Sequence, residues 1–126
     1  MIGIDLVDIK RFERFYGKFE KKALKRFLNN EEIELSNLKI QTLAGFFASK
    51  EAISKALGTG IGKELSFHDI KLYKDKKNAP YFTLPKKIIE KYEITDTALS
   101  ITHEQDYAIA VAYIQSNSSV KKPLYH

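Results

Sequence analysis

One continuous stretch, AGFFASKEAISKALGTGIG at residues 44–62, constrains the fold more than any other part of the chain. Up to Leu57 it favours a helix, because Ala, Phe, Lys and Glu dominate and the apolar residues recur at three- and four-residue spacings. The helix should end at Gly58, which can take the left-handed conformation, and Gly60 extends an open turn. We therefore predict a central helix that begins near Ile40 and ends in a glycine-rich loop.

A charged pair lies on one face of this predicted helix. At about 100° per residue, Glu51 and Lys55 lie one above the other, away from the apolar stripe. Taken alone, such a pair is most often a surface ion pair that contributes roughly 0.3 kcal/mol to the helix. Followed directly by GTGIG, it offers a carboxylate for a hard cation, an ammonium for phosphate and open backbone N–H groups. This combination suits a diphosphate bound with magnesium.

The first residues of the chain show the alternation of a short strand. Ile2, Ile4 and Leu6 share one face, which we predict to be buried. Asp5 then points to the opposite face. A lone Asp in a strand is most often solvated or part of a turn, because strands disfavour it.

Basic residues are concentrated in one segment. The net charge is +5, and much of the excess lies between Lys10 and Arg26. Such a segment indicates an anionic partner, which could be nucleic acid, an acidic membrane or an acidic protein. Its apolar residues, Phe15 among them, recur at helical spacing, so we expect one helix, or two that meet at Gly17. Asn30 is expected to cap the acidic helix that follows.

Composition excludes several classes of protein. The chain has no cysteine, which excludes disulfides, thiolate metal sites and a cysteine nucleophile. No apolar run approaches about 18 residues, and no signal-peptide pattern opens the sequence. We therefore expect a soluble, cytoplasmic protein that does not bind membranes.

The second half of the chain reads as hairpins. Strand, helices and hairpins in this order predict an α+β fold, in which an antiparallel sheet packs against helices. The length of 126 residues is sufficient for one domain, which we place at residues 1–115, with a loose tail at 116–126. The hairpin strands are expected at residues 65–73, 81–84, 98–102 and 107–114, with a short helix after Pro85.

Four segments together resemble one family, the holo-acyl-carrier-protein synthases, which are the small bacterial class of 4'-phosphopantetheinyl transferases. The resemblance implies transfer of the 4'-phosphopantetheine group of coenzyme A to a serine of apo-acyl-carrier protein, for fatty acid biosynthesis, with release of adenosine 3',5'-bisphosphate. It also implies a trimer whose active sites lie between neighbouring subunits. The segments are GIDLVDIKRF at 3–12, FFASKEAISKALGTGIG at 46–62, LSFHDI at 65–70 and SITHEQDYAIAVAYI at 100–114.

The resemblance assigns magnesium and the reaction to a few charged residues. Asp5 falls on the family's N-terminal magnesium aspartate, and Glu51 supplies the second carboxylate, with Asp8 as the fallback ligand. Lys55 would neutralise a diphosphate oxygen. The serine proton would be removed either by Glu51 or by a metal-bound water, and the sequence leaves both open.

Coenzyme A would be bound by Lys55, by the loop Gly58, Thr59 and Gly60, and by His103. This histidine matches the family's SITH motif, whereas a lone His at a turn is more often an ordinary polar residue. One position departs from the family. Many members carry Arg where this chain has Phe46, so a phosphate contact made by that Arg is lost or replaced, with Lys50 as the candidate.

The basic segment would bind the acidic carrier protein. The alternative is a small basic nucleic-acid-binding module, which would use the same charges together with exposed aromatic residues. The core-like spacing of the aromatic residues in this segment argues against that alternative. The predicted docking residues are Arg11, Arg14, Lys18, Lys22 and Lys25.

Overall fold

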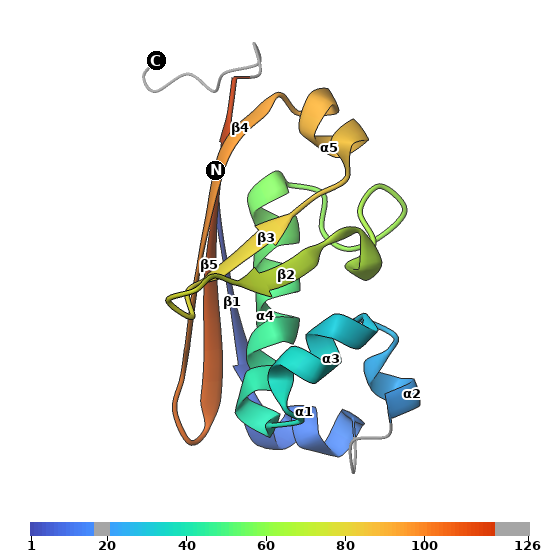
Figure 1. The fold of residues 1–126 in the computed structure, drawn as a ribbon, viewed down its shortest axis with the longest axis vertical. Helices are drawn as coiled ribbons and strands as arrows, with labels where there is room; N and C mark the ends of the chain where they lie inside the picture. Colours follow the sequence, from blue (N-terminus) through green and yellow to red (C-terminus); the bar gives the residue numbers. More distant parts are fainter. Residues whose placement is uncertain (17–20, 118–126) are drawn as a thin grey trace, which may run out of the picture.

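The computed structural model describes residues 1–16 and 21–117. Its main sheet has three antiparallel strands in the order β1-β5-β4. The long helix α4 (Ile40–Leu57) lies along one face of this sheet, as Figure 1 shows. The predicted α+β class is therefore confirmed. The strands are β1 (Ile2–Asp8), β4 (Ile94–His103) and β5 (Tyr107–Ser116).

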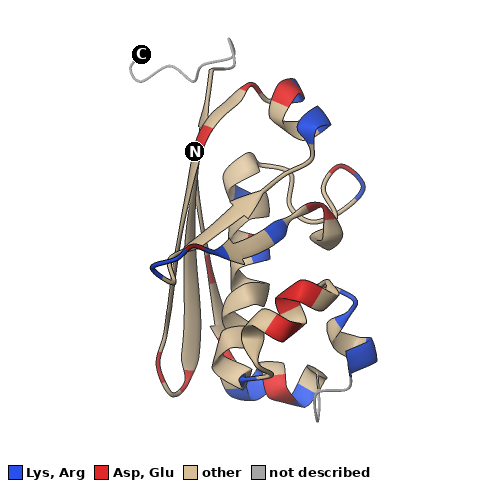
Figure 2. Cartoon of the chain, in the orientation of Figure 1, with Lys and Arg blue, Asp and Glu red and all other residues tan. Residues whose placement is uncertain are grey.

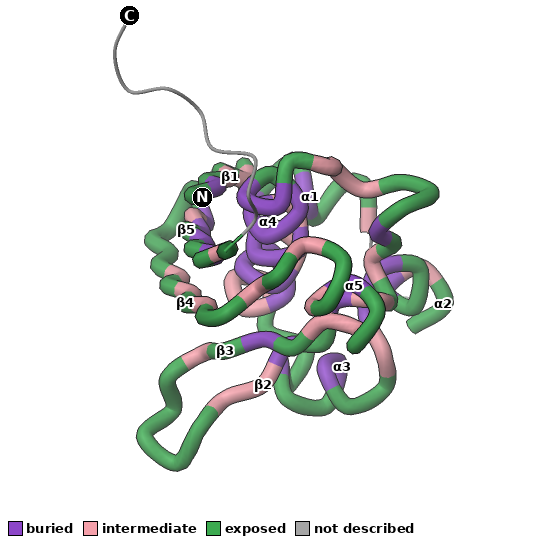
Figure 3. Tube along the Cα trace, turned by 90° about the horizontal axis from the view of Figure 1, so that it is seen from above, coloured by how far each residue is buried: buried purple, intermediate pink, exposed green. Residues whose placement is uncertain are grey.

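Shorter elements pack around the other sides of α4 and leave it almost entirely buried (Figure 3). None of the helices within the described ranges is both long and apolar enough to cross a bilayer. β5 runs to Ser116, and the predicted tail beyond residue 117 lies outside the described ranges. The shorter elements are α1 (Ile9–Tyr16), α2 (Lys21–Leu24), α3 (Asn30–Ser36), a 3₁₀ turn (Phe67–Asp69), β2 (Lys71–Lys74), β3 (Pro80–Thr83) and α5 (Lys86–Lys91).

Helix α4 approaches the sheet very closely, because small residues line the contact. Ala108, Ala110 and Ala112 of β5 face the helix and are fully buried. On β1, a Cβ atom at Gly3 would lie 1.9 Å from the carbonyl oxygen of Ala52. Any side chain at this position would force the strand and the helix apart.

The predicted orientation of β1 is wrong. Ile2, Ile4 and Leu6 are 72%, 59% and 56% exposed, and the residues between them face α4. An alternating strand has two faces, and the face next to a close-packed helix must carry the small residues. The isoleucines therefore lie on the outer face of the sheet, beside Val111 and Tyr113 of β5, and no described element covers this face (Figure 1).

The helix ends show one confirmed prediction and one error. Gly58 ends α4 with a φ of 88°, in the left-handed region as expected. Asn29, and not Asn30, caps α3. Its side chain accepts the Glu32 N–H at 2.8 Å, and the Glu32 carboxylate accepts the Asn29 N–H at 2.9 Å. This reciprocal pair is a capping box, which satisfies two otherwise free donors and outcompetes a cap one residue later.

An aromatic cluster holds α1 against α4. The rings of Phe12 and Tyr16 lie 4.7 Å apart, and both contact Phe27 and Phe47. Phe15, which we expected in the core, is instead 70% exposed, and the Arg11 guanidinium lies 5.6 Å from the centre of its ring. The predicted bend at Gly17 lies outside the described residues.

Lys50 of α4 forms a fully buried ion pair with Glu32 of α3. Its Nζ lies 2.9 Å from the Glu32 carboxylate and 3.0 Å from the carbonyl oxygen of Phe67. The other Glu32 oxygen accepts the Leu72 N–H at 2.8 Å. Burial lowers the pKa of Lys50, and the hydrogen bond and charge of Glu32 oppose this shift. The pair joins α3, α4, the 3₁₀ turn and β2 at a single point.

Candidate active site

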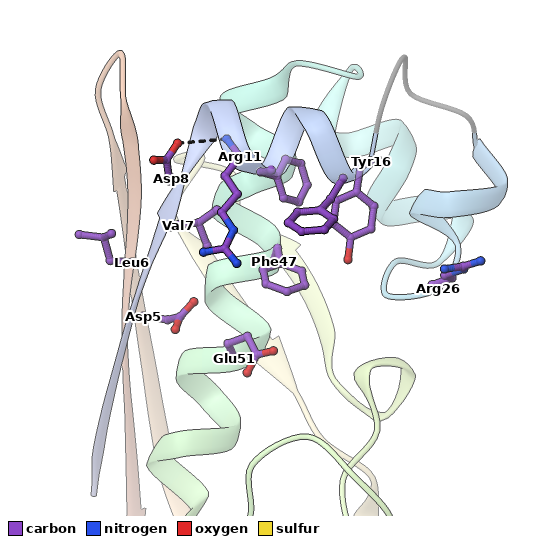
Figure 4. Close-up of a pocket in the computed structure, with 11 residues that line it drawn as sticks. Asp5, Leu6, Val7, Asp8, Arg11, Tyr16, Arg26, Phe47 and Glu51 are labelled. Carbon is purple, nitrogen blue, oxygen red and sulfur yellow. Dashed lines mark hydrogen bonds between the residues drawn. The ribbon is translucent and has the colours of Figure 1, made fainter.

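A cleft of about 630 Å³ opens between β1, α1 and α4 (Figure 4). Two carboxylates, Asp5 and Glu51, lie on one side of it, and an aromatic wall lies on the other. The carboxylates come from residues that are distant in sequence, and the close contact between β1 and α4 brings them together. The remaining lining residues are Leu6, Val7, Asp8, Arg11, Phe12, Phe15, Tyr16, Arg26 and Phe47.

Lys55 contacts Asp5 directly. Its Nζ lies 2.8 Å from Asp5 Oδ1 and 3.2 Å from the carbonyl oxygen of Ile4. The ammonium group is therefore bound to β1, fifty positions away in sequence, and is not simply the partner of Glu51 on its own helix. This contact argues against the interpretation of Glu51 and Lys55 as an ordinary surface pair.

Glu51 lies in an environment that disfavours its charged form. Burial raises the pKa of the Glu51 carboxyl, the charge of Asp5 raises it further, and the charge of Lys55 opposes both. Two carboxylates that repel each other in a partly buried cleft attract a cation.

The residues of the cleft fit magnesium. Mg²⁺ is typically held by one or two carboxylates, several waters and the phosphates of a substrate. Asp5 and Glu51 supply that number of carboxylates. Over residues 1–16 and 21–117, no group of three or more His, Cys, Asp or Glu is placed to bind a metal, so water or substrate would complete the coordination. Asp8, the fallback ligand, instead accepts the Arg11 N–H at 3.1 Å and caps α1.

The glycine-rich loop does not present free N–H groups at its start. The backbone N–H groups of Gly58, Thr59 and Gly60 all bond to the carbonyl oxygen of Ser54, at 3.1, 3.2 and 3.2 Å. The expectation of open donors is therefore wrong here, because the unpaired carbonyls at the end of α4 bind them. A Cβ at Gly58 or Gly60 would meet nothing within 4 Å, so the loop surface is open to close approach by a ligand.

His103 lies away from the carboxylates, in a second hollow of about 190 Å³. The two cavities share no lining residue, and β5 separates His103 on β4 from Asp5 on β1. A single chain therefore does not bring His103 to the predicted magnesium site. The hollow is lined by Thr42, Phe46, Lys74, Asn78, Pro80, Ile101 and His103.

The second hollow also corrects the prediction for position 46. Phe46 lines it, but Lys50 points away into the core and is held by Glu32. Lys50 is therefore unable to replace a missing Arg. Lys74 of β2 is the lysine that lines the same hollow as Phe46. No local pattern predicts this neighbour, because the two residues meet only in the fold.

Of the predicted docking residues, Arg11 lines the cleft. Arg11 and Arg14 are exposed on α1, and Lys22 and Lys25 are exposed in and just after α2, as Figure 2 shows by charge. Lys18 lies outside the described residues. Sequence reasoning missed two polar lining residues, Arg26 and Tyr16. Tyr16 falls among the apolar residues of the predicted helix, and its position beside the cleft depends on how α1 packs.

Comparisons with known proteins identify the family of this chain. A model of the 4'-phosphopantetheinyl transferase superfamily matches residues 1–112. The chain belongs to this superfamily. It is 54% identical to the holo-[acyl-carrier-protein] synthase of Wolinella succinogenes, over 91% of this chain and 97% of that protein. The predicted class of enzyme, a phosphopantetheinyl transferase, is thereby confirmed.

Solved structures agree with this assignment. The holo-[acyl-carrier-protein] synthase of Helicobacter pylori, determined in complex with coenzyme A, superposes with a TM-score of 0.87 at 50% identity, over 91% of this chain and 100% of that chain. The corresponding synthase of Neisseria meningitidis gives a TM-score of 0.82 at 33% identity, over 91% and 97% of the two chains. The family and the fold implied by the sequence motifs are thus confirmed.

Proposed function

We propose that this protein transfers the 4'-phosphopantetheine group of coenzyme A to a serine of apo-acyl-carrier protein, with Mg²⁺ bound by Asp5 and Glu51. The observation that carries the proposal is the meeting of these two carboxylates in one cleft, with Lys55 paired to Asp5. Phosphoryl transfer needs little covalent chemistry from a protein. It depends on positioning and on neutralising the charge of the phosphates.

Different groups at the cleft would neutralise the phosphates and remove the serine proton. Magnesium, when bound, supplies positive charge to the diphosphate. Lys55 is half exposed and bonds a single carboxylate oxygen, so its ammonium can exchange Asp5 for a phosphate oxygen at small cost. The serine proton leaves either to Glu51 or to a metal-bound water. The end of α4 carries partial negative charge from its carbonyl groups, and the Lys55 ammonium offsets that charge for an approaching phosphate.

We further propose that the protein acts as a trimer with shared active sites. The uncovered face of the sheet supports this, because exposed isoleucine, leucine, valine and tyrosine side chains form a continuous apolar surface there. The separation of the two cavities supports it as well. The hollow with His103 and Lys74 would complete the cleft of a neighbouring subunit, and both residues would contact coenzyme A from there.

The carrier protein would bind at Arg11, Arg14, Lys22 and Lys25, with Lys18 as a further predicted contact. These cations lie beside the cleft, where they would attract an acidic protein and bring its serine to the diphosphate. A nucleic-acid-binding module would use exposed aromatic residues on this face. Phe12 is buried but Phe15 is exposed there, so it is the family assignment that argues against this alternative. The absence of cysteine agrees with a cytoplasmic location.

Mass spectrometry tests the proposal directly. Apo-acyl-carrier protein incubated with this protein, coenzyme A and Mg²⁺ should gain the mass of 4'-phosphopantetheine, and chelation of Mg²⁺ should prevent the gain. The same reaction without this protein is the control. A carrier protein that keeps its mass under all conditions would refute the proposed activity. A stabilising thermal shift with an oligonucleotide, and none with coenzyme A, would favour the alternative module instead.

A further inference from the structure

The proposed reaction leaves the aromatic wall of the cleft unexplained. It uses Asp5, Glu51 and Lys55 at one end, yet the cleft continues along α1 past the rings of Phe12, Tyr16 and Phe47. Apolar ring faces do not bind a diphosphate or a metal ion. They suit a ligand segment that is built mainly of methylene and methyl groups.

Tyr16 places one polar atom in this apolar wall. Its ring is fixed by Phe12 at 4.7 Å and by Phe27 at 5.0 Å, measured between ring centroids. Figure 4 shows its hydroxyl pointing into the cleft that also contains Glu51. Among the described residues the hydroxyl has no hydrogen-bond partner. A partly buried phenol normally finds one, so a ligand group can supply it.

The hydroxyl is available as a donor. Burial raises the pKa of Tyr16, the charge of Arg26 opposes this shift, and the charge of Glu51 adds to it, so the group stays protonated at neutral pH. The complementary ligand atom is an oxygen that accepts, such as an amide carbonyl. The transferred half of coenzyme A contains amide groups along an otherwise apolar chain, whereas the nucleotide half does not combine these features.

We infer that Tyr16 binds the pantetheine arm of coenzyme A, with its hydroxyl donating a hydrogen bond to an amide carbonyl oxygen. The inference rests on the proposed function and assigns the aromatic wall to the group that is transferred. In the proposed trimer, the nucleotide half then lies toward the second hollow of a neighbouring subunit. Tyr16 is a binding residue in this role, because it contacts the arm and not the reacting phosphorus.

The test compares two ligands on one matched pair of variants. Tyr16→Phe removes only the hydroxyl and keeps the ring in the aromatic cluster. Tyr81→Phe is the control, since it removes a phenol hydroxyl from the exposed face of β3. Calorimetry with coenzyme A and with adenosine 3',5'-bisphosphate separates the arm from the nucleotide, because the second ligand lacks the arm.

Tyr16→Phe should weaken coenzyme A binding about fivefold, the effect of one neutral hydrogen bond, and leave bisphosphate binding unchanged. Tyr81→Phe should change neither. An equal loss for both ligands, or no loss for either, would overturn the inference. If the unmodified protein still modifies carrier protein in that case, the proposed function stands without it. An unmodified protein that binds no coenzyme A would overturn both.

Discussion

Two lysines on α4, five positions apart, form ion pairs of opposite character. Lys50 and Glu32 are 0% and 1% exposed, and their pair makes three further hydrogen bonds with the surrounding backbone, two accepted by Glu32 and one donated by Lys50. Lys55 and Asp5 are 52% and 16% exposed, and their pair is open to the cleft. The distance from nitrogen to oxygen is almost the same, 2.9 Å against 2.8 Å.

The difference shows that burial, and not contact distance, separates a structural pair from a functional one. A buried charge that loses its partner has no water to replace it, so the Lys50 pair is fixed. An exposed charge exchanges its partner easily, so Lys55 is able to leave Asp5 for a phosphate. One helix thus carries a charge that is fixed in the fold and, on another side, the charge that we propose serves the reaction.

The largest expected effect is on stability at the buried pair. Lys50→Ala should lower the free energy of unfolding by about 3–5 kcal/mol, because Glu32 is left as an unpaired buried charge. Chemical denaturation of the Lys50→Ala and Lys55→Ala variants side by side measures this loss in the free energy of unfolding. We expect the Lys55 variant to lose less than about 1 kcal/mol. Equal losses in the two variants would abolish the distinction between the pairs.

The second expected effect is on the rate of catalysis, and it concerns the exposed pair of Lys55 and Asp5. Lys55→Ala should lower the rate of transfer about 100-fold, equivalent to about 2.7 kcal/mol, as expected when one donor to a phosphate is removed. Lys55→Arg should restore only part of the rate, since a planar fork replaces a compact charge. Steady-state kinetics with carrier protein and coenzyme A provides the measurement. A Lys55→Ala enzyme with normal constants would mean that this pair is only a surface salt bridge.

The third expected effect is smaller and concerns binding of the carrier protein. It tests Arg14, a charged residue that is exposed on α1. Arg14→Glu should raise the Michaelis constant for carrier protein about tenfold, or about 1.4 kcal/mol, and leave that for coenzyme A nearly unchanged. Added salt should weaken carrier binding in the unmodified protein, because it screens exposed charges. If neither the substitution nor salt changes these kinetics, the carrier protein docks elsewhere.

The smallest effect is a gain in stability at the active site. The raised pKa of Glu51 means that the folded protein binds more protons than the unfolded chain between the ordinary carboxylate pKa and the raised value. Its contribution to stability therefore falls as pH rises through that window. Glu51→Gln should abolish transfer and yet slightly raise the melting temperature at neutral pH, with no gain in strong acid. Calorimetric melting across pH checks the sign, and a melting temperature lowered at neutral pH would contradict it.

Local signals in the sequence were enough to predict the helix α4, its end at Gly58 and the presence of two hairpins. The first predicted hairpin strand, 65–73, was too long, because a 3₁₀ turn occupies Phe67–Asp69 and the strand begins only at Lys71. Each correct prediction depends on residues a few positions apart, so spacing and turn chemistry are sufficient. The family motifs extended this to the enzyme class. The pairing of Lys55 with Asp5, and of Lys50 with Glu32, was beyond such reasoning, because each joins elements that only the folded chain brings together.

The error at β1 has a related cause. Alternation shows that Ile2, Ile4 and Leu6 share a face, but it does not show what covers that face. The same apolar stripe suits a core and a surface between subunits equally well. Here the small residues of the opposite face packed against α4, and the large ones were left outside.

The contact at Gly3 sets the dimensions of the reaction centre. Asp5 is two residues further along β1, and Glu51 is adjacent to Ala52, whose carbonyl oxygen occupies the space that a side chain at position 3 would need. The spacing between the two carboxylates therefore depends on the absence of a single methyl group. Misplacement of reacting groups by about 1 Å can slow a reaction about 100-fold. A hydrogen atom in place of a side chain thus sets the distance between the two carboxylates that would hold the proposed metal ion.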